Sequence, residues 1–291
     1  MKIAVSQGSF RSSVLHFISN LRTLGHDVIE VTSASSITEP INADFSIVWN
    51  GRGNYRDLIE RLPRPRALIW HEPMIYDGHD NCISCKKWWK TFCYSVDMWD
   101  LIFIYWNKIA YFIRQRTNVP IIEMPHGSFT LPLENVLDDK KDRVCFVGKY
   151  SKYRKKCVGS ILDSGIKIDW YKNKSTYPYI KSHYFKLLQQ YPIHLNIHRS
   201  GLCNGFETRV WDSFATNRLC ISEPMLDTEK WVVSGKHYLS IPIESFPPVI
   251  SYYLEHEKER DVIVQQGYSH GQKNTTLIRA ADIVNKIKEI K

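Results

Sequence analysis

The segment HLNIHRSGLCNGFETRVWDSFATNRLCIS, residues 194–222, combines residue types that can bind a phosphorylated ligand. Polar and apolar residues alternate in HLNIH, which predicts a strand that His198 leaves at its carboxyl end. Asn204 and Glu207 have the spacing of a capping box, so a helix is expected after the loop. The N–H groups and the dipole at such a helix start can bind a phosphate or diphosphate.

Asp212 lies two turns after Asn204, on the same face of the expected helix as Thr208. A carboxylate at this position can accept hydrogen bonds from the 2′- and 3′-hydroxyls of a ribose. The alternative is that Asn204 and Glu207 only cap the helix and that Asp212 lies on the surface. Spacing alone leaves both interpretations open.

Strand-length apolar runs separated by helix-length segments surround this motif. The first series is KIAVS, HDVIEVTS, FSIVWNG, RALIWHEP, DLIFIYW and VPIIEMPHG, and the second is RVCFVG, KIDWY, IHLNIH and RLCIS. This order predicts βαβ units with parallel sheets, so we expect an α/β protein with two Rossmann-like domains that face a cleft. The predicted domains are residues 1–130 and 142–274, and a C-terminal helix at 275–291 is expected to pack back on the first domain. Ligands of such sheets bind at the carboxyl ends of the strands.

Composition excludes several classes of protein. The chain has 291 residues, of which 43% are hydrophobic and 24% charged, as in a folded globular protein rather than a disordered one. Seven cysteines, an odd number, are not typical of a secreted disulfide framework. The apolar run in MKIAVSQGSF is too short for a signal peptide, and LIFIYWNKIAYFI is too short to span a bilayer. We therefore expect a soluble cytoplasmic protein without a membrane span.

The net charge of +9 is concentrated in three runs: KKWWK, KYSKYRKK and YKNKSTYPYIKSHYFK. Basic groups attract phosphates, and aromatic side chains among them can stack on bases. A solvated basic surface is the alternative for any single run. The three runs together favour a polyanionic partner.

One cluster has metal-ligand spacing. His79, Cys82, Cys85 and Cys93 form the pattern H-x2-C-x2-C-x7-C, and three thiolates with one imidazole suit a closed structural zinc site. The interpretation we favour is three reduced thiols packed in a loop and a helix, so no metal is predicted.

The stretch RVWDSFATNRLCIS resembles the nucleotide-sugar signature of GT-B glycosyltransferases, especially the spore-maturation-type branch. In that branch a glycine-containing loop leads into an Arg-Val-Phe-Glu-Ala-like helix and then a strand, and here Asp212 stands in place of the ribose-binding Glu. FVGKYSKYR is similar to the first strand and loop of the family's C-terminal domain, and MPHGSF to the element that closes the N-terminal domain. YLEHEKERDVIVQQGYSHGQKNTTLIRAADIV resembles the closing helices.

The resemblance implies an N-terminal acceptor-binding domain and a C-terminal domain that binds a nucleotide-diphosphate sugar. The expected reaction is a metal-independent hexosyl or pentosyl transfer that requires no cofactor, with a UDP-sugar as the expected co-substrate. The expected donor-binding residues are Gly148, Lys149, Arg154, His198, Arg199, Asn204, Gly205, Phe206, Glu207, Thr208, Arg209 and Asp212. Among them, the candidates to neutralise the leaving diphosphate are Lys149, Arg154, Arg199 and Arg209.

Two departures from the family bear on the chemistry. Many retaining enzymes of this type carry two acids separated by seven residues, and Asn204 stands at the upstream position, so retaining and inverting chemistry both stay open. The chain contains no Asp-x-Asp triplet, so the metal-dependent GT-A design has no support.

The acceptor is expected to meet the N-terminal domain. His71 and Glu72 follow the fourth strand and are the candidate catalytic bases for an inverting reaction, although both can also be loop residues with local hydrogen bonds. The candidate acceptor-binding residues are Gln7, Gly8, Ser9, Asn50, Gly51, Arg52, Lys86, Lys87, Trp88 and Trp89. The charge pattern favours a hydroxymethylated pyrimidine in DNA as the acceptor, of the kind that bacteriophage enzymes modify, which would place the protein in the host cytoplasm. The alternatives are a cell-surface polymer, a lipid-linked or small-molecule acceptor, or a non-catalytic nucleic-acid-binding module on a GT-B scaffold.

Overall fold

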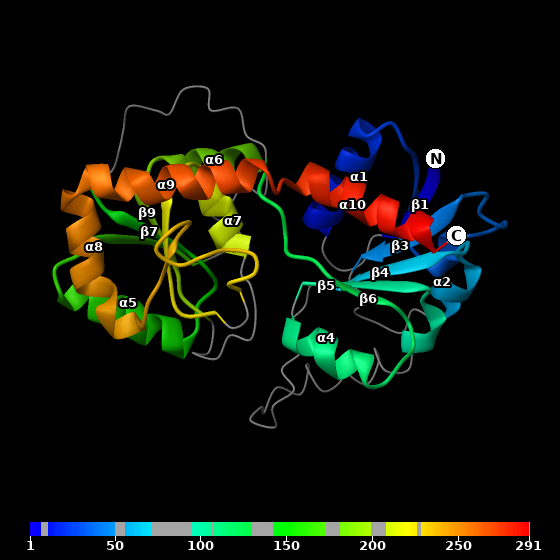
Figure 1. Ribbon diagram of the computed structural model, residues 1–291, viewed down its shortest axis with the longest axis horizontal. Coiled ribbons are helices and arrows are strands. Elements are labelled where there is room, and N and C mark those ends of the chain that lie inside the picture. Colours follow the sequence, from blue (N-terminus) through cyan, green and yellow to red (C-terminus); the bar gives the residue numbers. More distant parts are fainter. Residues whose placement is uncertain are drawn as a thin grey trace. The chain divides into compact units, whose positions relative to one another are not determined.

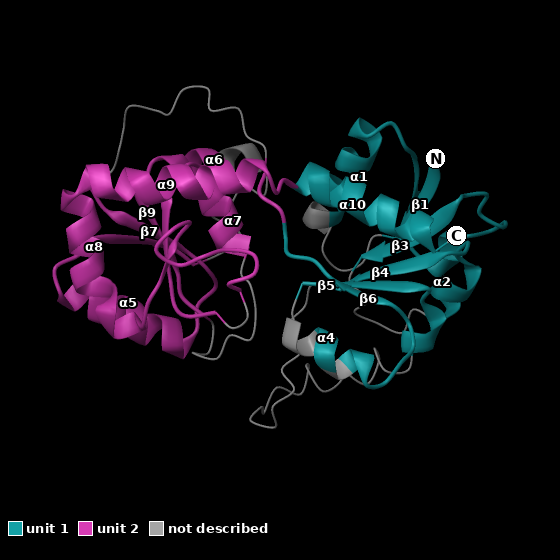
Figure 2. Cartoon of the chain, in the orientation of Figure 1, with its two compact units in different colours: residues 1–126, 276–291 teal, residues 127–275 magenta. Residues whose placement is uncertain are grey.

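The chain folds into two compact units, each built around a parallel β-sheet. The computed structural model describes residues 1–6, 11–49, 56–70, 95–105, 107–129, 142–172, 181–198, 208–225 and 228–290 (Figure 1). Unit 1 comprises Met1–His126 and Thr276–Lys291, and unit 2 comprises Gly127–Thr275 (Figure 2). The C-terminal segment of the chain therefore completes unit 1.

Unit 1 contains a six-stranded parallel sheet with the strand order β2-β1-β3-β4-β5-β6. Its strands are β1 (Lys2–Ser6), β2 (Asp27–Val31), β3 (Phe45–Trp49), β4 (Arg66–Trp70), β5 (Leu101–Ile104) and β6 (Ile121–Glu123). Its helices are α1 (Arg11–Thr23), α2 (Arg56–Arg61), α4 (Asn107–Arg114) and α10 (Thr276–Glu289), with short 3₁₀ turns at Ala34–Ser36 and Val96–Met98. The strand order reverses after β2, so right-handed crossovers place α1 on one face of the sheet and α2 and α4 on the other.

Helix α10 lies beside α1 on the same face of the unit 1 sheet (Figure 1). His16 Nε2 and Thr276 Oγ1 are 2.8 Å apart at the start of α10. The apolar stripe of α10 is buried through Ala280, Ile283, Val284 and Ile287. A helix far from unit 1 in sequence thus covers part of its core.

Unit 2 contains a five-stranded parallel sheet with the strand order β11-β10-β9-β7-β8. Its strands are β7 (Val144–Val147), β8 (Ile168–Tyr171), β9 (Ile193–Asn196), β10 (Leu219–Ser222) and β11 (Leu239–Ser240). Its helices are α5 (Lys152–Asp163), α6 (Lys181–Gln189), α7 (Thr208–Ala215), α8 (Phe246–Glu255) and α9 (Glu257–Gln272), with a 3₁₀ turn at Ile243–Ser245.

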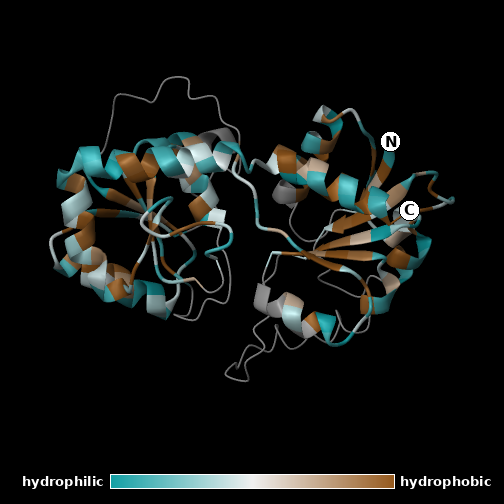
Figure 3. Ribbon diagram, in the orientation of Figure 1, coloured by the Kyte–Doolittle hydropathy of each residue, from teal (hydrophilic) through white to brown (hydrophobic). Residues whose placement is uncertain are grey.

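Hydrophobic residues are concentrated on the strands of both sheets and on the helix faces that cover them (Figure 3). In unit 2, α5, α8 and α9 cover one face of the sheet, where the largest cluster includes Val144, Phe146, Val158, Leu195, Ile221, Phe246, Ile250 and Ile263. Helices α6 and α7 cover the other face, where a smaller cluster includes Cys145, Phe185, Leu188, Tyr191 and Ala215. Burial on both faces explains why β7 and β10 are nearly continuous apolar runs in the sequence.

Helix α9 approaches α7 closely because glycine occupies the contact. A Cβ atom added at Gly267 would lie 2.4 Å from the carbonyl oxygen of His237 and 3.0 Å from the ring of Phe214. At Gly271 it would lie 2.9 Å from Phe214 Cβ. These two glycines therefore set the distance between α9 and the helix that carries Asp212.

The α/β class and the two parallel sheets predicted from the sequence are confirmed. The ten predicted strands correspond to β1–β10, and the predicted C-terminal helix corresponds to α10. Among the described residues, no helix is long and apolar enough to cross a membrane.

Candidate functional site

The unit 2 sheet has a topological switch point between β7 and β9. From β7 the chain runs through α5 to β8 on one side, and it then returns to β9 on the other side of β7. In open α/β sheets the crevice at such a point, at the carboxyl ends of the strands, is the usual ligand site. Gly148 follows β7 directly, and His198 lies two residues beyond β9. The sequence motif singled out by its residue types thus begins at the switch point.

Arg154, in the first turn of α5, bridges the two strands at the switch point. Its Nε donates to the carbonyl oxygen of Ile197 at 3.0 Å, and its Nη1 donates to that of Lys149 at 3.0 Å. The guanidinium carbon lies 5.3 Å from the centroid of the Phe146 ring, and the residue is only 4% exposed. Arg154 therefore holds the loop after β7 against the end of β9 and places a buried positive charge there.

Arg209, in the first turn of α7, makes a second bridge across the same point. Its Nε donates to the carbonyl oxygen of Val147 at 2.7 Å, and its Nη1 donates to Asn196 Oδ1 at 3.0 Å. Asn196 is fully buried, and its Nδ2 donates to Ser222 Oγ at 2.9 Å. The start of α7 is thereby fixed to the carboxyl ends of three neighbouring strands, β7, β9 and β10.

Gly148 leaves room for the arginine. A Cβ atom added at this position would lie 3.0 Å from Arg154 Nη1 and 3.0 Å from Phe146 Cζ. Its carbonyl oxygen accepts a hydrogen bond from Trp170 Nε1 at 2.9 Å. A larger residue would therefore displace either the guanidinium group or the buried ring.

A buried carboxylate fixes the backbone where the chain leaves β9. Glu223, which follows β10, accepts the backbone N–H of His198 at 2.5 Å and the hydroxyl of Tyr153. The His198 side chain is buried, and its Nε2 donates to the carbonyl oxygen of Pro224 at 3.1 Å, which assigns the proton to Nε2. Burial and the neighbouring Glu223 carboxylate raise the pKa of Tyr153 well above its usual range. These contacts determine the starting point of the segment that links β9 to α7.

Asp212 lies one turn into α7 and is 7% exposed. Its Oδ2 accepts a hydrogen bond from the hydroxyl of Tyr184, on α6, at 2.7 Å. Thr208, which the sequence places on the same face, is exposed at the start of the helix. The acid therefore lies between the two helices that cover one face of the sheet.

The structure describes only part of the predicted site. It brings Gly148, Lys149, Arg154, His198, Thr208, Arg209 and Asp212 to one end of the unit 2 sheet, with Lys149 exposed. The other predicted donor residues, Arg199, Asn204, Gly205, Phe206 and Glu207, lie outside the described residues, and so do the candidate bases, the acceptor-binding residues and the His/Cys cluster. The predicted acceptor segments 7–9 and 50–52 nevertheless follow β1 and β3, which are neighbours at the switch point of the unit 1 sheet.

Sequence reasoning missed four residues of this network: Tyr153, Tyr184, Asn196 and Glu223. Tyr184, Asn196 and Glu223 each form a hydrogen bond with a predicted residue, and Tyr153 is linked to the site through Glu223. Of these, only Asn196 carried a signal in the sequence, as a polar residue inside an apolar strand.

Residues 138–285, just over half of the chain, match the model of a family described as glycosyl transferase-like. The chain belongs to this family. The matched range contains every element of unit 2 that forms the site, from β7 to α9, together with most of α10. No relative among curated proteins matches the chain.

Several solved structures share the fold of this chain, although their sequences are only distantly similar to it. HepE from Anabaena, in complex with UDP and glucose, has a TM-score of 0.65 at 10% identity, over 99% of both chains. Sucrose-phosphate synthase from Thermosynechococcus elongatus has a TM-score of 0.66 at 8% identity, over 100% of both chains. The pneumococcal O-GlcNAc transferase GtfA, in complex with UDP and GlcNAc, has a TM-score of 0.56 at 12% identity. The match covers 84% of this chain but only 57% of the GtfA chain. The two-sheet GT-B fold implied by the sequence resemblance is thereby confirmed.

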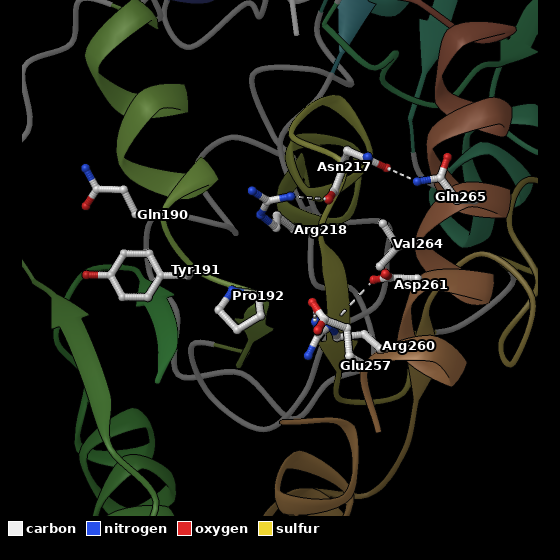
Figure 4. Close-up of a pocket in the computed structure, with 10 residues that line it drawn as sticks. All are labelled: Gln190, Tyr191, Pro192, Asn217, Arg218, Glu257, Arg260, Asp261, Val264 and Gln265. Carbon is white, nitrogen blue, oxygen red and sulfur yellow. Dashed lines mark hydrogen bonds and ion pairs between the residues drawn. The ribbon is translucent and has the colours of Figure 1, made fainter. Parts of the chain in front are cut away.

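Unit 2 also has a cavity of about 180 Å³ at the other end of its strands from the candidate site (Figure 4). Its lining residues are Gln190, Tyr191, Pro192, Asn217, Arg218, Glu257, Arg260, Asp261, Val264 and Gln265. Pro192 and Arg218 immediately precede β9 and β10, so the cavity lies at the amino ends of the strands. The Arg218 guanidinium donates to the carbonyl oxygen of Gln189, and Arg260 forms an ion pair with Glu257 at 2.9 Å. Arg218 therefore joins two turns, and Arg260 pairs within the first turn of α9, which indicates a structural role.

Proposed function

We propose that the protein is a glycosyltransferase that moves a sugar from a nucleotide-diphosphate sugar, with a UDP-sugar as donor, to a hydroxyl acceptor. Unit 2 would bind the donor, and unit 1 would bind the acceptor. The observation that carries this proposal is the convergence of Arg154, Arg209 and Asp212 at the switch point of the sheet inside the family-matched region.

The charges of the site suit a diphosphate. Two guanidinium groups converge on the carboxyl ends of β7 and β9, where the Phe146 ring lies 5.3 Å from Arg154 and 5.9 Å from Arg209. Buried positive charge held by backbone and amide contacts is pre-organised, so it needs little rearrangement when a leaving diphosphate develops its charge. Exposed Lys149 can add a third cation from the loop after β7.

The ligands named in the similar structures support the choice of nucleotide. HepE has been solved with UDP and glucose and with UDP-glucose, and GtfA with UDP and GlcNAc. A carboxylate in the position of Asp212 would accept the 2′- and 3′-hydroxyls of the ribose of such a nucleotide. The proposed donor site requires no metal and no cofactor.

For the acceptor we favour a hydroxymethylated pyrimidine base in DNA. The support is charge: the chain carries +9, and Lys149, Lys152, Lys155 and Lys156 are exposed around the start of α5. In an inverting reaction His71 or Glu72 would remove the proton of the acceptor hydroxyl. A polymer, lipid-linked or small-molecule acceptor is the competing proposal, and one similar structure, Staphylococcus aureus TarM, was solved with α-GlcNAc-glycerol.

The experiment begins with nucleotide-sugars and measures the shift in melting temperature. A UDP-sugar is expected to raise the melting temperature, because a ligand that binds only the folded state stabilises it. Asp212→Asn should abolish the shift. Asp163→Asn, at an exposed acid at the end of α5, should leave the shift unchanged. No shift with any nucleotide-sugar would contradict the donor assignment and favour a binding module.

The acceptor is then tested with plain and hydroxymethylated duplex DNA by mass spectrometry. A mass gain of one sugar on hydroxymethylated DNA alone supports the favoured acceptor. A donor-dependent shift without a DNA product favours the polymer, lipid-linked or small-molecule acceptors.

A further inference from the structure

The contact between Tyr184 and Asp212 joins two helices on the same face of the unit 2 sheet. Tyr184 is the fourth residue of α6, and Asp212 is the fifth residue of α7. The tyrosine hydroxyl donates to Asp212 Oδ2 at 2.7 Å, and the acid is almost completely buried. This hydrogen bond is the described contact through which α6 reaches the acid of the proposed donor site.

Packing between the helices does not require this polar pair. The cluster on this face is apolar and includes Phe185, Leu188 and Ala215, with the Tyr184 ring packed against it. The Tyr184 and Phe185 ring centroids are 5.1 Å apart. A phenylalanine at position 184 would keep these ring contacts, so the hydroxyl serves the carboxylate rather than the core.

The burial of the Asp212 carboxylate must be compensated by hydrogen bonds. Removing an ionised acid from water costs free energy unless hydrogen bonds replace the lost hydration. The Tyr184 hydroxyl supplies one such bond, and a carboxylate has about four acceptor positions on its two oxygens. An acid held in this way can still accept hydrogen bonds from a ligand, and loss of the tyrosine hydroxyl would remove one restraint on the rotation of its carboxylate.

We propose that Tyr184 is a positioning residue that orients the Asp212 carboxylate toward the ribose hydroxyls of the donor nucleotide. This inference rests on the proposed function. Two adjacent hydroxyls bind a carboxylate well only when its plane has one orientation, so the tyrosine would set the preference for a ribonucleotide over a deoxyribonucleotide. The Tyr184–Asp212 hydrogen bond would then increase the difference in affinity between these two ligands rather than the affinity for both.

The test measures the affinities of UDP and 2′-deoxy-UDP by isothermal titration calorimetry. The wild-type protein is expected to prefer UDP. Tyr184→Phe should weaken UDP binding by at least about tenfold while leaving 2′-deoxy-UDP binding nearly unchanged, as expected for one lost hydrogen bond to a charged group. The ratio of the two affinities should therefore fall toward one.

Tyr191→Phe is the matched control. Tyr191 donates a hydrogen bond to another acid of unit 2, Asp169 Oδ2, at 2.5 Å, and it lies between the end of α6 and the start of β9. Its hydroxyl also lies 2.6 Å from that of Tyr171, near the amino end of β9. Its replacement removes the same kind of bond away from Asp212, so it should lower the melting temperature without changing the UDP preference.

The outcomes separate the two proposals. If Asp212→Asn abolishes the preference and Tyr184→Phe leaves it within twofold of wild type, the donor site stands and the role of Tyr184 is refuted. If the wild-type protein binds neither UDP nor another nucleoside diphosphate, the proposed function fails and the inference fails with it. Loss of the preference in Tyr184→Phe but not in Tyr191→Phe supports the positioning role.

Discussion

Replacing Arg154 by methionine tests the bridge across the switch point most directly. Methionine keeps an unbranched apolar side chain but removes both hydrogen bonds to the carbonyl oxygens of Ile197 and Lys149. A hydrogen bond from a charged donor contributes about 1.5–3 kcal/mol. Relief from burying the guanidinium offsets part of the loss, because an ionised group in a protein interior carries a desolvation cost. We expect the free energy of unfolding of unit 2 to fall by about 2–4 kcal/mol.

Urea unfolding followed by tryptophan fluorescence measures this change, since Trp170 and Trp211 both lie in unit 2. Arg143→Met is the control, because Arg143 is half-buried and reaches Asp142 and Asp169 only at 3.5 Å. Contacts of this kind contribute less than about 1 kcal/mol. A loss below about 1 kcal/mol for Arg154→Met would refute the conclusion that the arginine holds the two strand ends together.

Further predictions concern packing and pH. Gly267→Ala should destabilise unit 2 by about 1–3 kcal/mol, because its Cβ would lie 2.4 Å from a backbone carbonyl oxygen. Gly159 lies in α5, and a Cβ atom added there would have no neighbouring atom within 4 Å, so Gly159→Ala should instead stabilise unit 2 by about 0.4–1 kcal/mol. Equal urea midpoints for the two variants would contradict this expectation. Burial lowers the pKa of His194 and of His237 from 6.5 to about 4. The neutral rings stabilise the fold fully above pH 6.5, and stability should be lost as pH falls toward 4, by about 1 kcal/mol per histidine between pH 6.5 and about pH 5.5. His194→Gln should remove about half of that pH dependence in urea titrations at several pH values.

The strands were predictable because parallel strands buried on both faces are short, continuous apolar runs. Phe45–Trp49 and Leu101–Ile104 are fully buried, and their sequences contain almost no polar residue. Strand β11 was not predicted, since its two residues, Leu239–Ser240, are too few for a periodic pattern. Its position follows from pairing with β10, which is a tertiary contact.

The site was predictable only where neighbouring positions in the sequence carry the chemistry. Thr208 and Asp212 lie one helical turn apart, so their spacing placed them on one face of the expected helix, and the family resemblance added Arg209. Their partners are distant in sequence: Tyr184 is 28 positions from Asp212, and Glu223 is 25 positions from His198. Such pairs are brought together by the packing of α6 on α7 and of β9 on β10, and no local spacing encodes them.

The alternation in HLNIH has a different meaning in the structure from the one that its period suggests. A polar residue at every second position usually indicates a strand with one face in water, yet all of β9 is buried. Its polar side chains point toward α7 instead: His194 contacts Ser213 Oγ at 3.0 Å, and Asn196 accepts from Arg209.

A buried polar seam of this kind fixes one helix against one strand, because each group loses its hydration unless it meets its own partner. Sliding α7 along β9 by one residue would break both contacts at once. The seam therefore determines where Arg209 and Asp212 lie relative to the carboxyl end of β9. This explains why a strand buried on both faces retains a histidine and an asparagine where apolar residues would pack as well. Their hydrogen bonds to α7 offset the free-energy cost of removing these polar groups from water and also fix the position of α7. The chemistry proposed for this end of the sheet depends on that position.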